Sequence, residues 1–239
     1  MLFRSRVKPE LQMKSWQERT ERIMGSEALG RLAEAHVAVF GLGGVGGHAA
    51  EALARAGVGA LSLIDMDTVD ETNLNRQLAA LRSTIGRNKT DVLAERIADI
   101  DPGCRVTKYT MFYLPETADA IDISQFDYVI DAVDTVAAKI CLAEKSREAG
   151  VPIICSMGTG NRLDPSKLMV TDISKTSGDP LAKAVRVELR KRGIGHLPVV
   201  FSEELPVKTG TRAPGSTPFV PAAAGLLLAS HVVRELAGL

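Results

Sequence analysis

Short runs of β-branched and apolar residues alternate along the chain with longer stretches of helical periodicity. The first run, residues 36–40, ends directly at a group of glycines, and the helical stretch at residues 44–56 that follows is built mainly of small and apolar side chains. Such a helix packs closely on a sheet, and Gly57 ends it. The same two patterns predict further strands and helices. We expect the strands at residues 60–64, 105–109, 128–131 and 152–156, and the helices at residues 17–33, 91–100 and 137–149.

This alternation predicts the α/β fold class, with a Rossmann-like, doubly wound and mainly parallel sheet. The rhythm changes after Gly160, where residues 167–172 and 198–201 favour strands around a helix at residues 180–192. We therefore expect a mixed extension at the C-terminal side of the sheet.

The end of the chain carries a polar segment and then an apolar one. Residues 202–218 hold four charges, three prolines and two glycines, which predicts a mobile loop. The apolar run at residues 219–233 is shorter than the roughly 20 residues that span a membrane. We expect a buried helix there and no membrane anchor.

Charge and cysteine content narrow the setting of the protein. The 29 basic and 29 acidic residues cancel, so any binding to nucleic acid must use a local patch. Three cysteines without a C-x-x-C pair provide neither a disulfide framework nor a four-thiolate zinc site. Residues 1–10 carry four charges and no apolar core, unlike a secretory signal. We therefore expect a cytoplasmic protein.

The glycines have the G-x-G-x-x-G spacing of a phosphate-binding loop, at Gly41, Gly43 and Gly46, with Gly44 between them. Because the loop lies between a strand and a helix, its amides and the helix N-terminus can face a phosphate. Asp65 ends the next strand, where a carboxylate normally accepts hydrogen bonds from ribose. These features fit a nicotinamide dehydrogenase as well as an ATP-binding enzyme. A close contact of helix on sheet, without a ligand, is the remaining alternative.

Polar residues after the second strand favour ATP over a dinucleotide. Asp67, Asn73 and Arg76 lie in the long loop after this strand, and Lys89 follows them. A triphosphate needs more cations than a pyrophosphate, and Arg76 and Lys89 can supply them. The chain has no G-x-x-x-x-G-K-[ST] motif, so it is not a P-loop ATPase.

Two aspartates, Asp131 and Asp134, lie at and beyond the end of a predicted strand, at the carboxyl edge of the sheet where ligands bind. A carboxylate about 4 Å from a phosphate oxygen costs roughly 4 kcal/mol at an effective dielectric constant of about 20. A bridging Mg²⁺ removes this conflict, and Asp134 is the candidate ligand. The alternative is that either aspartate caps the helix expected at residues 137–149.

Two motifs, G-x-G-G-x-G and D-x-D-x-V-x-x-x-N-L-x-R-Q, resemble those of the superfamily of ubiquitin-activating and sulfur-carrier-adenylating enzymes, over residues 17–160. The resemblance implies an ATP-binding, adenylating domain over residues 1–239, with its nucleotide-binding core at residues 11–160 and a substrate-side extension at residues 161–239. With Lys89 and Asp134, which follow the motifs, the resemblance also implies the residues that bind ATP and Mg²⁺: Asp65 the ribose, Asn73, Arg76 and Lys89 the phosphates, and Asp134 the metal.

Residues 19–25 are similar to the arginine-bearing segment that, in this superfamily, crosses a dimer interface to the ATP of the partner. The similarity implies a homodimer in which Arg19 acts in trans. Trp16 stands where the family has a preceding arginine, so an exposed helix arginine without a catalytic role is the alternative.

The C-terminal half resembles the branch of this superfamily that dehydrates threonylcarbamoyladenosine in tRNA, through residues 170–176, 179–182 and 200–204. This branch implies an ATP-dependent ligase or cyclase that forms an acyl-adenylate and then closes a ring with release of AMP. The modified tRNA is the implied partner, and a sulfur-relay partner stays open. Adenylation of a ubiquitin-like sulfur carrier and a non-catalytic nucleotide-binding regulatory domain are the alternatives.

Two further features have a functional and a structural interpretation. Cys155 could form a thioester, but its place in a buried strand favours packing. Basic residues gather on the helix expected at residues 180–192, where they would contact tRNA phosphates or form a solvated face. These residues are Lys183, Arg186, Arg190, Lys191 and Arg192.

Overall fold

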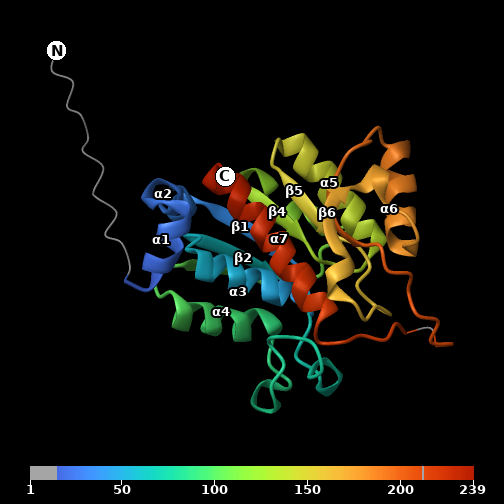
Figure 1. Ribbon diagram of the computed structural model, residues 1–239, viewed down its shortest axis with the longest axis horizontal. Coiled ribbons are helices and arrows are strands. Elements are labelled where there is room, and N and C mark those ends of the chain that lie inside the picture. The colour runs from blue at the N-terminus through green and yellow to red at the C-terminus, as the bar shows by residue number, and fades with distance from the viewer. Residues whose placement is uncertain (1–14, 212) are drawn as a thin grey trace.

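A seven-stranded sheet forms the centre of the structure, a computed structural model that describes residues 15–211 and 213–239 (Figure 1). The strands lie in the order β3-β2-β1-β4-β5-β7-β6. Residues 1–10, on which the expectation of no export signal rests, lie outside the described residues. The strands are β1 (His36–Phe40), β2 (Ala60–Ile64), β3 (Arg105–Tyr109), β4 (Tyr128–Asp131), β5 (Ile153–Ser156), β6 (Leu168–Asp172) and β7 (Pro198–Ser202).

The sheet is doubly wound and mainly parallel, which confirms the predicted fold class. β2 and β3 lie on one side of β1, and β4 and β5 lie on the other, so the winding reverses between β1 and β4. Ligands bind at such a reversal, beyond the carboxyl ends of the strands. Among the described strands only β6 is antiparallel, with Leu168 opposite Ser202 of β7. The extension at the C-terminal side is therefore mixed, as expected.

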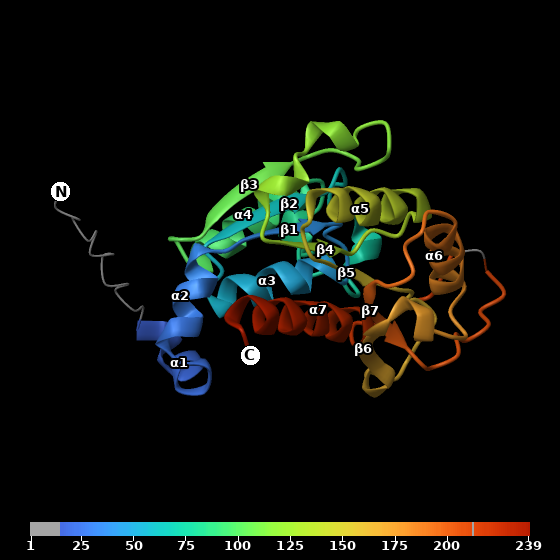
Figure 2. The ribbon, with the colours of Figure 1, turned by 90° about the horizontal axis from the view of Figure 1, so that it is seen from above.

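Helices cover both faces of the sheet (Figure 2). Neighbouring residues of a strand point to opposite faces, so Val39 enters the core beneath α2, α3, α4 and α7, whereas Phe40 enters the core beneath α5 and α6. The α-helices are α1 (Glu18–Met24), α2 (Ser26–Glu34), α3 (Gly46–Ala56), α4 (Lys89–Ile100), α5 (Val136–Ala149), α6 (Pro180–Lys191) and α7 (Val220–Ala237).

The single helix predicted over residues 17–33 is wrong, because Gly25 divides it into α1 and α2. Gly25 has a φ of 83°, which interrupts the helical hydrogen bonds and which residues with a side chain rarely adopt. α2 buries Leu29 and Leu32 in the core, whereas α1 buries no residue. α1 therefore lies at the edge of the molecule (Figure 1).

The apolar helix α7 belongs to the core. By length and composition it could cross a membrane, but half of it is buried inside the protein. Ala224, Leu228 and Val232 have no exposed surface and lie in the same core as α3 and the sheet. Packing inside the fold explains the apolar character of this segment, in agreement with the prediction of a buried helix.

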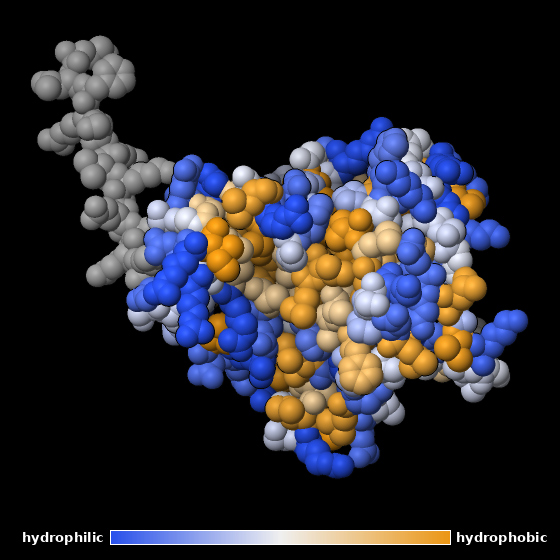
Figure 3. Space-filling view, viewed as in Figure 1, coloured by the Kyte–Doolittle hydropathy of each residue, from blue (hydrophilic) through white to orange (hydrophobic). Residues whose placement is uncertain are grey.

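An apolar groove of about 490 Å³ lies between α1, α3 and α7. Its lining includes Ile23, Ala52, Leu226 and Val233, and Ile23 is 85% exposed. Figure 3 shows apolar side chains along this face of the molecule. The groove lies toward the C-terminal end of α3, away from the glycine loop at its N-terminal end.

A fully buried ion pair joins α5 to the ends of β4 and β5. Nζ of Lys139 lies 3.1 Å from each carboxylate oxygen of Asp131 and donates a hydrogen bond to the main-chain oxygen of Ser156 at 2.7 Å. The amide of Val133 donates to the same carboxylate at 3.1 Å. Removing two charges from water is costly, so their good geometry and these additional hydrogen bonds are needed to keep the pair. The pair thereby fixes the loops that follow β4 and β5.

Replacing Lys139 should destabilise the fold. We expect Lys139→Met to lower the free energy of unfolding by about 3–5 kcal/mol, because the Asp131 carboxylate stays buried without its cation. Lys145→Met, on the same helix, is the matched control: its partner Asp119 is 91% exposed, so the change should lie within experimental error. Urea unfolding followed by circular dichroism measures both variants, and equal unfolding midpoints would contradict the role of the buried pair.

Candidate functional site

The glycine loop between β1 and α3 is folded tightly onto the end of the sheet. Gly41 has a φ of 83°, and its amide donates to the main-chain oxygen of Ile64 at 2.8 Å. A Cβ atom on Gly46 would lie 1.8 Å from the Gly41 oxygen, and one on Gly41 would lie 2.7 Å from the Ala132 oxygen. Only glycine permits this approach. α3 begins at Gly46 without a side-chain cap, which leaves its positive N-terminal dipole available to an anion.

Asp65 joins the glycine loop to the end of β2. One carboxylate oxygen accepts from the Leu42 amide at 2.6 Å, and the other accepts from the Asp67 amide at 2.8 Å. The side chain is 9% exposed, and this burial raises the pKa of the carboxyl, whereas the Lys89 charge opposes the rise. Each oxygen keeps a second lone pair, which can accept a hydrogen bond from a ribose hydroxyl.

Lys89 lies beneath the long loop that follows β2, with a side chain that is 5% exposed. Its Nζ lies 2.7 Å from a carboxylate oxygen of Asp67 and 4.0 Å from one of Asp65. Main-chain bonding brings it there: the Lys89 amide donates to the Asp67 oxygen at 3.1 Å, and Thr68 forms a bridge with Asn88. The structure therefore places Asp65, Asp67 and Lys89 together, as the sequence predicts.

Arg76 lies in the long loop that follows β2. Its side chain packs against the glycine loop. Its Nη1 donates to the Thr72 main-chain oxygen at 2.9 Å and to Oδ1 of Asn75 at 2.8 Å. Its Cγ would lie 3.4 Å from a Cβ atom on Gly44. Asn73 has a structural task as well, because its Oδ1 accepts from the Asp70 amide at 3.2 Å and closes the capping box of this turn.

Asp134 is exposed and accepts a hydrogen bond only from the neighbouring Thr135 hydroxyl, at 3.3 Å, among the described residues. The alternative that Asp131 or Asp134 caps α5 is wrong, because the N-cap residue is Thr135, which makes no side-chain cap bond, and Asp131 pairs with Lys139. A free carboxylate fits Mg²⁺, which takes one or two carboxylates together with phosphate oxygens. No group of three or more His, Cys, Asp or Glu residues that could hold a metal occurs in the described part of the chain, so phosphates would have to complete the coordination.

Arg19 lies outside this constellation. It is exposed on α1, and the neighbouring Gln17 contacts the position of Gly57, which follows the C-terminal end of α3. The glycine loop lies at the N-terminal end of that helix. Arg19 is therefore separated by the length of α3 from the site of its own chain.

The basic cluster predicted on α6 is only partly available to a ligand. Arg186 donates to the main-chain oxygen of Thr176 at 3.0 Å, so it serves the loop before α6. Lys191 and Arg192 both pair with Glu188, at 2.6 and 2.9 Å. Neighbouring acceptors thus engage three of the five basic residues, and contact with tRNA phosphates and a solvated face both stay open for this helix.

The site predicted from the sequence includes neither Lys139 nor Asn75. A lysine within the apolar run of residues 136–143 is a signal of a buried ion pair, and Asp131 stands eight positions before it. Asn75 occupies a variable position of its motif, and no sequence signal distinguishes it. Cys155 is fully buried, and burial raises the pKa of its thiol well above the ordinary value, so it does not supply a ready thiolate.

A doubly wound sheet that brings two cations to a glycine loop at its point of reversal has the architecture of a nucleotide-binding protein. The chain belongs to the ThiF family, whose family model matches residues 17–238. The match includes the C-terminal strands and α7 as well as the glycine loop and the long loop after β2.

Individual relatives extend this similarity over nearly the whole chain. The tRNA threonylcarbamoyladenosine dehydratase of Bacillus subtilis is 45% identical over 236 residues, which cover 91% of this chain and 93% of that protein. Crystal structures of the Escherichia coli tRNA N6-threonylcarbamoyladenosine dehydratase, TcdA, in complex with AMP and with ATP, are each 40% identical to this chain. Their TM-scores are 0.89 and 0.87, with 95% of this chain and 96% of the TcdA chain covered in each comparison.

Lys89→Met should raise the pKa of Asp65 further. Burial already raises this pKa, and the Lys89 charge is the strongest influence that opposes the rise. A carboxyl whose pKa is higher in the folded chain favours folding at low pH, and this contribution is lost as the pH rises through the folded-state pKa. The variant should therefore be less stable than the parent at neutral pH and recover part of the difference on acidification through that pKa. Carbon-13 NMR titration of the Asp65 carboxyl and urea unfolding at several pH values measure the two effects.

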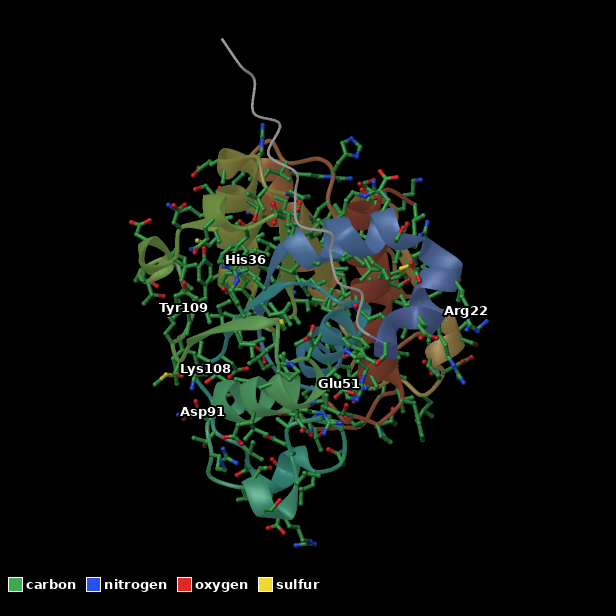
Figure 4. All side chains as sticks on the ribbon, turned by 90° about the vertical axis from the view of Figure 1, so that its left-hand side faces the viewer. Arg22, His36, Glu51, Asp91, Lys108 and Tyr109 are labelled. Atoms are coloured by element: carbon green, nitrogen blue, oxygen red, sulfur yellow. The ribbon has the colours of Figure 1, made fainter. Side chains whose placement is uncertain are left out.

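Lys108→Met is the matched control for this substitution. Lys108 on β3 pairs with Asp91 on α4 at 2.6 Å, at the exposed edge seen in Figure 4. The Lys108→Met substitution removes one lysine whose partner lies on α4, the helix that begins at Lys89, but it leaves the surroundings of Asp65 intact. Equal titration of Asp65 in both variants would show that Lys89 does not control this carboxyl.

Proposed function

We propose that this chain is an ATP-dependent enzyme that dehydrates threonylcarbamoyladenosine in tRNA, by ligase or cyclase chemistry through an acyl-adenylate. The observation that carries the proposal is the placement of Arg76 beside the glycine loop, and of Lys89 beside the Asp65 carboxylate that binds this loop. The chain is also 45% identical to the Bacillus subtilis dehydratase. The Escherichia coli relative has been crystallised with ATP and with AMP, which are the nucleotide consumed and the nucleotide released in this reaction.

The reaction requires orientation and charge neutralisation rather than a protein nucleophile. The carboxylate of the modified nucleoside attacks the α-phosphorus of ATP, a phosphorus–oxygen bond forms, and pyrophosphate leaves. A neighbouring nitrogen then attacks the activated carbonyl and closes a ring. The bond from that carbonyl to the AMP oxygen breaks, so AMP carries away the oxygen, and the nitrogen releases its proton. The nucleoside has lost the elements of one water.

The side chains of the site divide this work. Asp65 accepts from the ribose through its remaining lone pairs, and Lys89, held by Asp67, neutralises the phosphates together with Arg76. Asn73 shapes the turn that presents the guanidinium. Asp134 is the ligand that we assign to Mg²⁺, which when bound supplies charge neutralisation between this carboxylate and the phosphates.

A second copy of the chain completes the proposed site. Arg19 is remote from the site of its own chain, so its proposed action on ATP occurs across a homodimer. The apolar groove between α1, α3 and α7 lies next to the helix that carries Arg19, and its coverage by a second copy would remove exposed apolar surface from water. We further propose that residues 11–160 bind the nucleotide, that residues 161–239 face the tRNA, and that the protein works in the cytoplasm.

The product of the reaction tests the proposal directly. Purified protein incubated with ATP, Mg²⁺ and tRNA that carries threonylcarbamoyladenosine should give AMP and a nucleoside lighter by one water, detected by mass spectrometry. Pyrophosphate exchange that depends on a carrier protein ending in Gly-Gly, without loss of mass from the nucleoside, would show a carrier-adenylating enzyme instead. Nucleotide binding without turnover of either substrate would show a regulatory domain.

The action of Arg19 across the dimer has its own test. Arg19→Ala and Asp134→Ala should each abolish activity as homodimers, whereas a mixture allowed to exchange subunits should recover about one quarter of the parent rate, because half of the dimers are mixed and each has one complete site. Arg22→Ala is the control on the same helix: Arg22 pairs with Glu18 at 3.7 Å and should not be required. Failure of the exchanged mixture to recover activity would contradict action in trans.

A further inference from the structure

The chain between β7 and α7 passes from the substrate side of the sheet to the nucleotide side. We call residues 203–211 and 213–219 the strap. Figure 1 shows the strap, in orange and red, leaving the right-hand side of the molecule and reaching the start of α7. That start abuts the glycine loop, since Pro221 would lie 3.0 Å from a Cβ atom on Gly44.

On the substrate side, the strap is tied to the loop that follows β5. Asn161 exchanges two hydrogen bonds with Gly215: its amide donates to the Gly215 oxygen at 2.8 Å, and its Oδ1 accepts from the Gly215 amide at 2.6 Å. Asn161 has a φ of 59°, a conformation that asparagine tolerates better than most residues. Glu204 accepts from the amides of Leu163 and Asp164, at 3.0 Å each. These bonds define the path of the strap at this end.

At the residue after Gly215, the strap is tied to the nucleotide side by the side chain of Asn75. Its Nδ2 donates to the main-chain oxygen of Ser216 at 3.1 Å, while its Oδ1 accepts from Nη1 of Arg76 at 2.8 Å. A primary amide is suited to this task because it offers a donor and an acceptor at once. Asn75 thus stands between the strap and an arginine assigned to the phosphates.

The bridge is flanked by polar atoms whose hydrogen bonding is incomplete. Among the described residues, Oε1 of Gln77 and Oγ1 of Thr217 are buried without a hydrogen-bond partner. Each lies within two positions of a bridging residue, one on either side of the contact. Buried polar groups without a partner are costly, so the contact between the strap and the nucleotide loop is not fully satisfied by these two segments alone.

A phosphate bound to Arg76 would affect the hydrogen bonds that Asn75 makes with Arg76 and Ser216. Among the described residues, both bonds of the Arg76 guanidinium use Nη1, which leaves Nε and Nη2 for a phosphate. A phosphate held there restricts the guanidinium. The guanidinium in turn restricts the amide of Asn75, and thereby its bond to Ser216.

We propose that Asn75 is a positioning residue that couples the phosphates of ATP to the strap, so that the strap is held in place over the substrate side when a triphosphate is bound. The inference rests on the ATP site of the proposed function. It adds a residue that touches neither ribose nor phosphate and acts through Arg76 on one side and Ser216 on the other.

Proteolysis of the strap measures this coupling. Lys208 is exposed on the strap and offers a site to trypsin. In the parent chain, a saturating non-hydrolysable ATP analogue should slow cleavage after Lys208 by about three- to tenfold, the factor that one net hydrogen bond provides, and AMP should protect less. Asn75→Asp keeps the acceptor for Arg76 and removes the donor to Ser216, so it should abolish this protection at saturating analogue.

Two controls make the result specific. Ser216→Ala keeps the main-chain oxygen that accepts the bond, so it should be protected like the parent. Calorimetry of analogue binding to each variant shows that saturation is reached. Asn75→Asp should also raise the KM for modified tRNA by a larger factor than the KM for ATP, a pattern that a general loss of structure would not produce.

The outcomes separate the two proposals. Failure of the parent chain to bind the analogue overturns the proposed function, and the coupling with it. Binding of the analogue with equal protection of Lys208 in the parent and in Asn75→Asp overturns the coupling alone. Loss of protection in Asn75→Asp, with protection retained in Ser216→Ala, supports it.

Discussion

The carboxylate of Asp65 is the contact on which the nucleotide-facing edge depends, because it accepts from the glycine loop and from the loop after β2 at once. The carboxylate does this while buried, where ionisation is unfavourable, and Lys89 offsets part of that cost. The same lysine is shared with Asp67 at 2.7 Å. The shape and the charge of the site are therefore not independent, because the residues that hold the loops in place are those that we assign to the nucleotide.

This arrangement limits what one chain can do for a triphosphate. The charges of Asp65 and Asp67 cancel those of Lys89 and Arg76, so the local field attracts an anion only weakly. Main-chain amides and the dipole of α3 contribute, but the developing charge on a transferred phosphorus demands more. Additional positive charge has two sources in the proposed scheme, Mg²⁺ at Asp134 and Arg19 of a second copy. Because the charges within one chain balance, the proposed site has a physical need for both Mg²⁺ and the arginine of a second copy.

Much of the fold and the central part of the site could be predicted from the sequence, because short-range rules govern them. The strands follow from apolar runs, and the glycine spacing together with its flanking elements is enough to specify a phosphate loop. The break at Gly25 escapes prediction because neighbouring helix-forming residues outweigh one glycine in the pattern. Helical spacing does not predict the hydrogen bond of Arg186 either, because its acceptor, the Thr176 oxygen, lies outside the helix. Long-range partners decide such positions.

Asn75 and Asp131 show the same limit for residues that act by joining elements. Asp131 lies in the pattern expected of a ligand or a helix cap, yet it pairs with Lys139. A lysine in an apolar run signals a buried ion pair, but the packing of α5 against β4 identifies its partner. The role proposed for Asn75 depends on its hydrogen bond to Ser216, which lies 141 positions further along the chain.

An acyl-adenylate gives a physical reason for such joining residues. The intermediate is lost to hydrolysis if water reaches it before the ring closes, so the substrate side needs to be covered while the activated carbonyl exists. The strap can provide this cover only if its position depends on the nucleotide, because a permanently fixed cover would also obstruct a substrate as large as tRNA. Hydrogen bonds between Asn161 and Gly215, and from Asn75 beside Arg76 to the adjacent Ser216, meet both requirements if Arg76 binds the phosphates as proposed.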